Sequence, residues 1–254
     1  MLPAEVAEGF HLAFLTALAD SAGADSFALK GGSNIRFYFS SLRFSEDIDL
    51  DVFARDPRTF TGRVEKAFGS QALSRLLSSI GVTVIDLNPK DRSTTRERWM
   101  VGLRHRSLPA DVRTKVELSH RTSDLSRFVT VERVPASAVA RYAPLPAPLV
   151  AHYLPAGAIA QKATTIGQRS ETQPRDVFDL DHLSRMFPSA PVRGLVAETD
   201  LSASIERVYE IGFPEYRSKV VPFIEPSLQA SFDSQDVWGA MQVRAIEALE
   251  GMRA

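Results

Sequence analysis

The chain has 254 residues, of which 44% are hydrophobic and 24% charged, and these fractions exclude a disordered or collagen-like protein. Its 30 Lys and Arg balance its 31 Asp and Glu, so any nucleic-acid contact must come from a local basic patch and not from overall charge. Cysteine is absent, which excludes disulfides and thiol chemistry. The N-terminus lacks the pattern of a signal peptide and no apolar run approaches about twenty residues, so we expect a cytoplasmic protein without a membrane span.

The first half of the chain predicts alternating helices and strands. Apolar residues three or four apart predict an amphipathic helix over Glu5 to Ala22. Ser26 to Leu29 predicts a short strand, followed by a glycine turn and a helix capped by Ser33. An acidic strand is expected over Asp47 to Phe53, and a long amphipathic stretch over Asp56 to Ile80. Three more strands are predicted over Val82 to Leu87, Trp99 to Arg104 and Val112 to Leu118.

The second half is expected to be helical. Five of the fifteen prolines lie between Pro135 and Pro155, where they disfavour helix and central strand, so we place a domain linker there. Helical patterns follow over Ala156 to Arg169, Pro174 to Phe187, Leu201 to Ile211 and Ser234 to Met252. We therefore expect an α/β core with a short mixed sheet over residues 1–135 and an α-helical domain over 145–254, with a site in the cleft that they form.

The glycine turn is a candidate phosphate site. Gly31 and Gly32 allow the backbone to turn tightly and approach a ligand closely. With Ser33 at the N-cap, free amides of the following helix could receive phosphate oxygens. Such a turn also occurs in many ordinary loops.

The acidic strand is a candidate metal site. Asp47 and Asp49 are two residues apart, so their carboxylates project from one face within roughly 7 Å. Two such carboxylates repel each other unless a cation lies with them, and Mg²⁺ held together with substrate phosphates suits them. Asp51 continues the same face, and the sequence leaves its participation open. An Asp-x-Asp strand end can also be a plain exposed edge, and it is the order and spacing after the glycine turn that favour a site.

The residues Leu29 to Ser33, Arg36 and Arg43 to Asp49 together resemble the DNA polymerase β-like nucleotidyltransferase superfamily. Within it, they are similar to the AbiEii-like, or MenT-like, nucleotidyltransferase toxins. This resemblance implies a polymerase β-like core and an NTP substrate. It also implies nucleotide contacts from the following matching residues: Gly31, Gly32, Ser33, Arg36 and Ser45. Ser45 could alternatively cap the entry to the strand.

A second block resembles the same family: Ile159 to Lys162, Arg169 and Arg175 to Leu180. Lys162 and Arg169 are seven residues apart, so one helix face could present both cations to a triphosphate. The resemblance implies that Lys162 contacts nucleotide phosphates and that Asp176 completes the site by orienting Lys162 or Arg169. The alternative is a structural ion pair of Arg175 with Asp179 and a solvated Lys162.

Two further residues have open roles. Many polymerase β-like enzymes carry a third carboxylate that acts as a base or metal ligand, and Glu117 is the candidate here. Arg43 could bind a phosphate or neutralise Asp47 and Asp49 when metal is absent.

The expected activity is therefore Mg²⁺-dependent nucleotidyl transfer from an NTP. By resemblance the acceptor is RNA, with a tRNA 3′ end as the expected case, and a cognate antitoxin restrains the toxin. The segment Lys90 to Arg133 has eleven Lys and Arg against six Asp and Glu, and could hold RNA or be a solvated strand region. The alternatives are a nucleotidyltransferase that modifies a small molecule or a protein side chain, and a non-catalytic binding module with the same fold.

Overall fold

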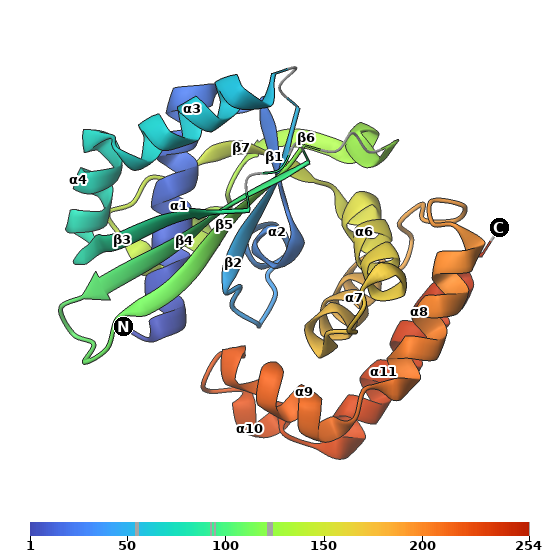
Figure 1. Cartoon of the computed structure of the whole chain (residues 1–254). Coiled ribbons are helices and arrows are strands. Elements are labelled where there is room, and N and C mark those ends of the chain that lie inside the picture. Colours follow the sequence, from blue (N-terminus) through green and yellow to red (C-terminus); the bar gives the residue numbers. More distant parts are fainter. Residues whose placement is uncertain (54–55, 92, 94, 121–123, 254) are drawn as a thin grey trace. The chain divides into compact units, whose positions relative to one another are not determined.

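The computed structural model describes residues 1–253 except 54–55, 92, 94 and 121–123, and it divides the chain into two units (Figure 1). The sheet unit comprises Met1–Ser40 and Phe44–Tyr153. The helical unit comprises Leu154–Ala254 together with the short segment Ser41–Arg43, which precedes the acidic strand in the sequence. The division therefore falls after Tyr153, near the C-terminal end of the proline-rich stretch 135–155.

The sheet unit contains a seven-stranded mixed sheet in the order β3-β4-β5-β2-β1-β7-β6. β2 pairs antiparallel with β1 and parallel with β5, and β1 pairs parallel with β7. The mixed α/β class predicted from the sequence is confirmed. The strands are β1 (Phe27–Lys30), β2 (Asp47–Val52), β3 (Val82–Lys90), β4 (Arg96–His105), β5 (Val112–Ser119), β6 (Val129–Arg133) and β7 (Leu149–Tyr153).

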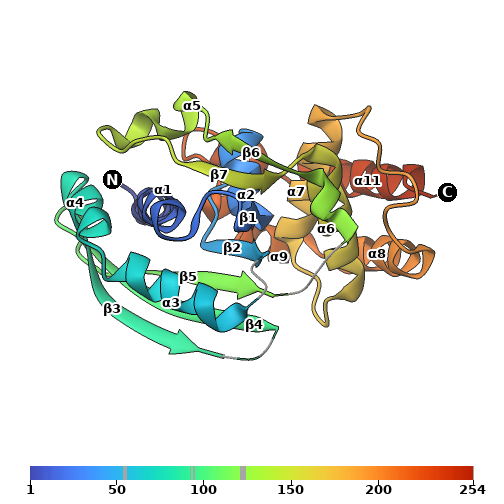
Figure 2. The same cartoon turned by 90° about the horizontal axis from the view of Figure 1, so that it is seen from above.

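The sheet curves around helix α1 (Pro3–Ala22), as Figure 2 shows. The buried side of α1 packs against α3 (Pro57–Phe68) and α4 (Gln71–Ser79), and a chain of aromatic rings joins these helices to the sheet. The ring centroid of Phe14 lies 4.7 Å from that of Phe68. The ring centroid of Phe68 in turn lies 6.1 Å from that of Trp99 on β4. One apolar core therefore fixes the helices on this face of the sheet.

The stretch predicted as continuous over 56–80 is two helices. α3 ends at Phe68, and the side chain of Ser70 then accepts a hydrogen bond of 3.1 Å from the amide of Leu73. This N-cap starts α4 in a new direction. The remaining helical segments of this unit are α2 (Gly31–Tyr38), α5 (Ala136–Val139) and the 3-10 turns Asp124–Phe128 and Ala140–Tyr142.

Strands β6 and β7 were not expected from the sequence. β7 begins directly after Pro148, so the prolines end before the strand and do not interrupt it. Ala151 and His152 of β7 pair with β1, and Asn34 donates a hydrogen bond of 2.9 Å to the carbonyl of Tyr153. The predicted linker region thus contains a central strand of the sheet.

The helical unit is built around α6, which packs against α7 and α8, while α11 packs against α7 and α8. Segment Ser41–Arg43 joins this unit through a bridge of Arg43 with Ile224 and a hydrogen bond of 3.0 Å from the amide of Glu225 to the carbonyl of Leu42. The helices are α6 (Pro155–Gln168), α7 (Pro174–Met186), α8 (Glu198–Glu210), α9 (Phe213–Lys219), α10 (Gln229–Phe232) and α11 (Gln235–Gly251), with a 3-10 turn at Val221–Phe223.

Among the described helices, none combines the length and the apolar character that crossing a membrane requires.

The close approach of α6 and α8 depends on Gly167. A Cβ added there would lie 2.5 Å from the carbonyl oxygen of Asp200 and 2.8 Å from Oγ of Ser204. We therefore predict that Gly167→Ala lowers the free energy of unfolding by about 1–3 kcal/mol, because the two helices must move apart.

The control is Gly239→Ala in α11, where a Cβ meets nothing within 4 Å. This substitution should stabilise the protein by up to about 1 kcal/mol through helix propensity. Urea unfolding measures both values, and equal effects of the two substitutions would contradict the packing argument.

Candidate functional site

Strand β2 places three aspartates on one face of the sheet. Because β2 and β5 are parallel and in register, Asp47 lies beside Lys115 and Asp49 beside Glu117. The predicted pair Asp47 and Asp49 therefore shares a face, and Glu117 joins it from the neighbouring strand. Three carboxylates on two adjacent strands repel one another unless cations compensate them.

The protein itself compensates two of the three aspartates on this face. Oδ2 of Asp47 lies 3.0 Å from the ammonium of Lys115. Asp51, which is 5% exposed, binds the ammonium of Lys30 at 2.5 Å and accepts a hydrogen bond of 2.7 Å from the hydroxyl of Tyr153. The carboxylate of Asp51 is thus already paired with Lys30 and Tyr153.

Asp49 differs in its direct contacts. Among the described residues, its carboxylate forms no hydrogen bond and no ion pair. Burial raises the pKa of Asp49, although the charges of Lys115 and Lys30 pull it down. A Cβ on Gly31, whose φ is +66°, would lie 2.8 Å from Oδ2 of Asp49, so glycine keeps this carboxylate open. A hard cation at Asp49 would meet a ligand that the protein leaves unused.

The structure corrects the predicted cap of the glycine turn. Gly31 and Gly32 are the first residues of α2, and Lys30 occupies the N-cap position without a side-chain cap. Ser33 is therefore the third residue of the helix and does not cap it. The positive φ of Gly31 lets the helix begin directly after β1, three residues earlier than expected.

Ser33 and Ser45 both bind the start of the acidic strand. The hydroxyl of Ser33 donates a hydrogen bond of 2.7 Å to the carbonyl of Asp47, and the hydroxyl of Ser45 donates one of 2.9 Å to the same oxygen. Both serines are buried. They hold Asp47 relative to α2, and their predicted contacts with a nucleotide stay predictions.

Arg36 lies at a buried ion pair. Its Nε donates a hydrogen bond of 2.7 Å to Glu8, and its guanidinium lies 4.2 Å from the ring centroid of Phe44. Burial raises the pKa of Glu8, against the opposing charge of Arg36. The guanidinium thus has a role in packing α2 against α1, and its predicted nucleotide contact stays a prediction.

The second predicted block forms a buried charge cluster within the helical unit. The ammonium of Lys162, on α6, lies 2.8 Å from Oδ1 of Asp176 and 2.7 Å from Oδ2 of Asp179, both on α7. Lys162 is 8% exposed, so the alternative in which it is solvated is wrong. Burial alone would lower the pKa of Lys162, but Asp176 and Asp179 outweigh it and raise the pKa. The ammonium therefore stays charged.

Two arginines complete this cluster. Nη2 of Arg43 lies 2.9 Å from Asp179, and Nε of Arg169 lies 3.1 Å from Asp176. Burial alone would raise the pKa of Asp179, but Arg43 and Lys162 outweigh it and lower the pKa to about 2. The five side chains hold three positive and two negative charges, and Arg169 is 38% exposed. The cluster thus keeps an excess positive charge with an accessible guanidinium.

Arg43 has a partner that the sequence did not predict. It pairs with Asp179, whereas the sequence suggested a phosphate or the pair Asp47 and Asp49. The reason is that segment Ser41–Arg43 belongs to the helical unit. Neither Arg43 nor Lys115 could be assigned from the sequence, because their partners lie on distant elements. The alternation of Lys115 and Glu117 along β5 was visible, but its register with β2 was not.

Several cations of the basic segment Lys90 to Arg133 are paired with carboxylates, so its surface is less positive than its composition suggests. Several of its cations lie within 3.0 Å of a carboxylate. These ion pairs are Arg98 with Glu117, Arg104 with Asp111, Arg113 with Asp86 and Lys115 with Asp47. Surface pairs of this kind are weak, so a polyanion could still compete for the cations.

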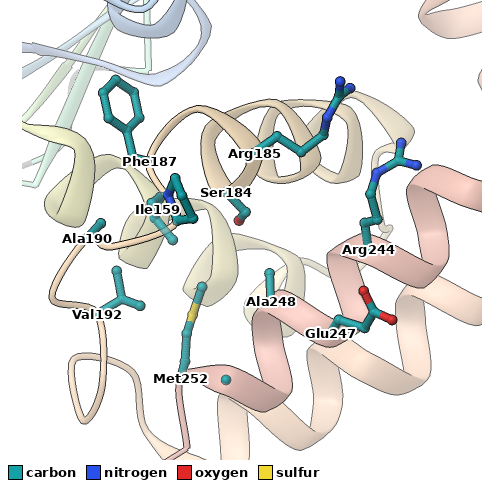
Figure 3. Close-up of a pocket in the computed structure, with 12 residues that line it drawn as sticks. Ile159, Ser184, Arg185, Phe187, Ala190, Val192, Arg244, Glu247, Ala248 and Met252 are labelled. Atoms are coloured by element: carbon teal, nitrogen blue, oxygen red, sulfur yellow. The ribbon is translucent and has the colours of Figure 1, made fainter.

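A pocket of about 370 Å³ lies within the helical unit, lined by residues of α6, α7 and α11 (Figure 3). Its walls are largely apolar, and the guanidinium of Arg244 at its edge binds Asp181 at 2.5 Å. In the described part of the chain, none of the predicted site residues lines this pocket. The predicted site residues therefore do not form this pocket.

Comparison with solved structures shows which fold the chain has. The crystal structure of JHP933 from Helicobacter pylori matches with a TM-score of 0.58 and 19% identity, covering 98% of this chain and 93% of that chain. MenT4, a nucleotidyltransferase toxin from Mycobacterium tuberculosis, matches with a TM-score of 0.51 and 15% identity, covering 100% of this chain and 96% of that chain. The fold is thus that of nucleotidyltransferases. No curated protein matches the chain at the sequence level.

The sequence model of the family described as "Nucleotidyl transferase AbiEii toxin, Type IV TA system" matches residues 13–243. The protein therefore belongs to the AbiEii toxin family and is a nucleotidyltransferase of a toxin–antitoxin system. The resemblance inferred from the glycine turn, the acidic strand and the second block is confirmed.

The buried cluster predicts a pH dependence of stability. The pKa of Asp179 lies below its ordinary value of 3.8, so its contribution is fully present above that value and is lost as the pH falls toward 2. Between pH 6 and pH 3 the wild type should lose about 1 kcal/mol through this group.

Asp179→Asn should lower the free energy of unfolding by about 3–5 kcal/mol at pH 6, because Lys162 and Arg43 lose a buried partner. Urea unfolding of both proteins at pH 6, 4 and 3 measures the difference. It should shrink as the pH falls, and a difference that stays constant would show that Asp179 is not held ionised by the cluster.

Proposed function

We propose that the protein transfers a nucleotidyl group from an NTP to RNA, with the 3′ end of tRNA as the acceptor and Mg²⁺ as the cofactor. The observation that carries the proposal is Asp49, a partly buried carboxylate without a cation of its own, beside Asp47 and the Gly31 turn. Family membership supports the reaction class, and the type IV toxin–antitoxin assignment supports an antitoxin partner.

Mg²⁺ fits Asp47 and Asp49. Both supply hard oxygen ligands on one strand face, and the space beside Gly31 keeps Asp49 open. No group of three or more His, Asp or Glu side chains in the described residues is arranged to hold a metal by itself. This suits Mg²⁺, which is commonly bound through one or two carboxylates together with substrate phosphates and water. When bound, the ion supplies positive charge against the triphosphate oxygens.

The phosphates need further positive charge from the protein. Lys162 and Arg169 supply it, since their cluster holds one more positive than negative charge. In this proposal Asp176 positions both cations, because its two oxygens bind one each. The backbone of Gly31 and Gly32 at the start of α2 supports the phosphates further.

The reaction needs little covalent participation by the protein. An acceptor hydroxyl oxygen bonds to the α-phosphorus, the bond from that phosphorus to the bridging oxygen breaks, pyrophosphate leaves with the electron pair, and the hydroxyl proton passes to water. Burial favours a neutral Glu117, but Lys115 and Arg98 outweigh it and lower its pKa. Glu117 is therefore a weak base here, and positioning and charge supply most of the rate.

The acceptor is tested with labelled NTPs. Purified protein is incubated with each labelled NTP and Mg²⁺ in the presence of total tRNA, a protein extract or small hydroxylated compounds. The proposal predicts label at the 3′ end of tRNA. Label in the protein or small-molecule fractions alone would replace RNA as the acceptor, and no transfer to any fraction would contradict the proposed activity.

Asp49→Asn should reduce nucleotidyl transfer by at least about 100-fold, because the carboxylate that binds Mg²⁺ loses its charge. The matched control is Asp86→Asn, which changes a carboxylate on β3 that pairs with Arg113. Its transfer rate should stay near wild type. An Asp49→Asn enzyme with wild-type turnover would exclude Asp49 as a metal ligand.

Expression of the chain alone should arrest bacterial growth, and Lys162→Ala or Asp47→Ala should relieve the arrest. Western blotting verifies that the variants accumulate to wild-type levels. Full arrest by both variants would show that toxicity does not come from nucleotidyl transfer at these residues.

A further inference from the structure

Lys115 lies between two of the carboxylates on the acidic face. Its ammonium is 3.0 Å from Oδ2 of Asp47 and 3.6 Å from Oε2 of Glu117. The same oxygen of Glu117 also accepts hydrogen bonds of 3.1 and 2.9 Å from Nε and Nη2 of Arg98. Two of the three carboxylates are thus already neutralised by cations of the sheet.

The position of Lys115 is fixed by the backbone. β5 pairs with β2 on one side and β4 on the other, and in this ladder Lys115 lies beside Asp47 while Glu117 lies beside both Asp49 and Arg98. The side chain of Lys115 is 20% exposed. The backbone register therefore keeps Lys115 beside Asp47 in the folded protein.

The charges of this face favour one divalent ion. Asp47, Asp49 and Glu117 contribute three negative charges, and Lys115 contributes one positive charge with a second from Arg98, which also pairs with the more exposed Asp91 at 3.0 Å. One negative charge remains, next to the carboxylate of Asp49. A second divalent ion would need Asp47 and Glu117 to exchange their present partners for metal.

We propose that Lys115 takes the place of a second divalent metal ion, so that this face binds one ion at Asp47 and Asp49. In two-metal sites, two ions about 4 Å apart compensate the attacking and leaving oxygens of a phosphoryl group. Here Lys115 provides the second positive charge from the protein itself. The inference rests on the proposed function, because it presupposes a metal and a triphosphate on this face.

This arrangement has two opposite consequences for removal of the lysine charge. Without Lys115, Asp47 is free and the face is more negative, so divalent ions bind more tightly. The triphosphate loses a compensating cation, so NTP binds more weakly. Removing a residue with a merely structural role would not raise the affinity for divalent ions while lowering the affinity for NTP.

The test is a Mn²⁺ titration of the full chain, followed by electron paramagnetic resonance of the free ion. Wild type should bind one Mn²⁺ at the carboxylates. Lys115→Met should bind the first Mn²⁺ about 30-fold more tightly, the effect of one unit charge on a divalent ion at about 4 Å in water, and should gain a second ion. Its KM for NTP should rise.

Two control variants keep the result interpretable. Lys115→Arg retains the charge and should bind one Mn²⁺ with near wild-type affinity. Arg113→Met removes a cation two residues earlier on β5, which pairs with Asp86, and should leave Mn²⁺ affinity unchanged. Thermal melting of each variant verifies folding. If Lys115→Arg behaves like Lys115→Met, a charge-based role is excluded.

Other outcomes separate this inference from the proposed function. Two Mn²⁺ ions on the wild type, or unchanged stoichiometry and affinity in Lys115→Met, would overturn the role of Lys115 and leave metal binding at Asp47 and Asp49 intact. If the wild type binds no Mn²⁺, or if the Mn²⁺ that it binds is still bound by Asp49→Asn, the proposed function itself is contradicted, and this inference with it.

Discussion

The structure depends on how closely spaced carboxylates are compensated. On the sheet, parallel pairing of β2 with β5 brings Asp47, Asp49 and Glu117 to one face, and the protein neutralises all but Asp49. An uncompensated carboxylate costs free energy in a folded protein, so its retention points to an external cation. In the proposed function, Mg²⁺ meets this deficit of positive charge at Asp49.

The helical unit meets the opposite condition. Asp176 and Asp179 are almost fully buried, and Lys162, Arg43 and Arg169 overcompensate them. Unlike Asp49, each of these two buried carboxylates is paired with cations of the protein and holds them in position. The helical unit thus carries an excess positive charge, which in the proposed function compensates phosphate oxygens.

The spacing of residues along the sequence predicted those features that depend only on residues close together in the chain. The shared face of Asp47 and Asp49 follows from the two-residue period of a strand, and the mixed α/β class follows from the order of the elements. The partners of these residues could not be predicted, because they are set by register and tertiary contacts. Lys115 reaches Asp47 across a parallel pairing, and Arg43 reaches Asp179 across 136 residues. The wrong cap at Ser33 arose because the positive φ of Gly31 starts α2 earlier.

Isothermal titration calorimetry of NTP binding with and without Mg²⁺ tests the central claim most directly. If Asp49 binds a divalent cation that also contacts the triphosphate, wild type should bind NTP much more tightly with Mg²⁺ than with EDTA. The Asp49→Asn variant should lose this difference. Equal NTP affinity in the two conditions, or an undiminished Mg²⁺ effect in Asp49→Asn, would contradict the account.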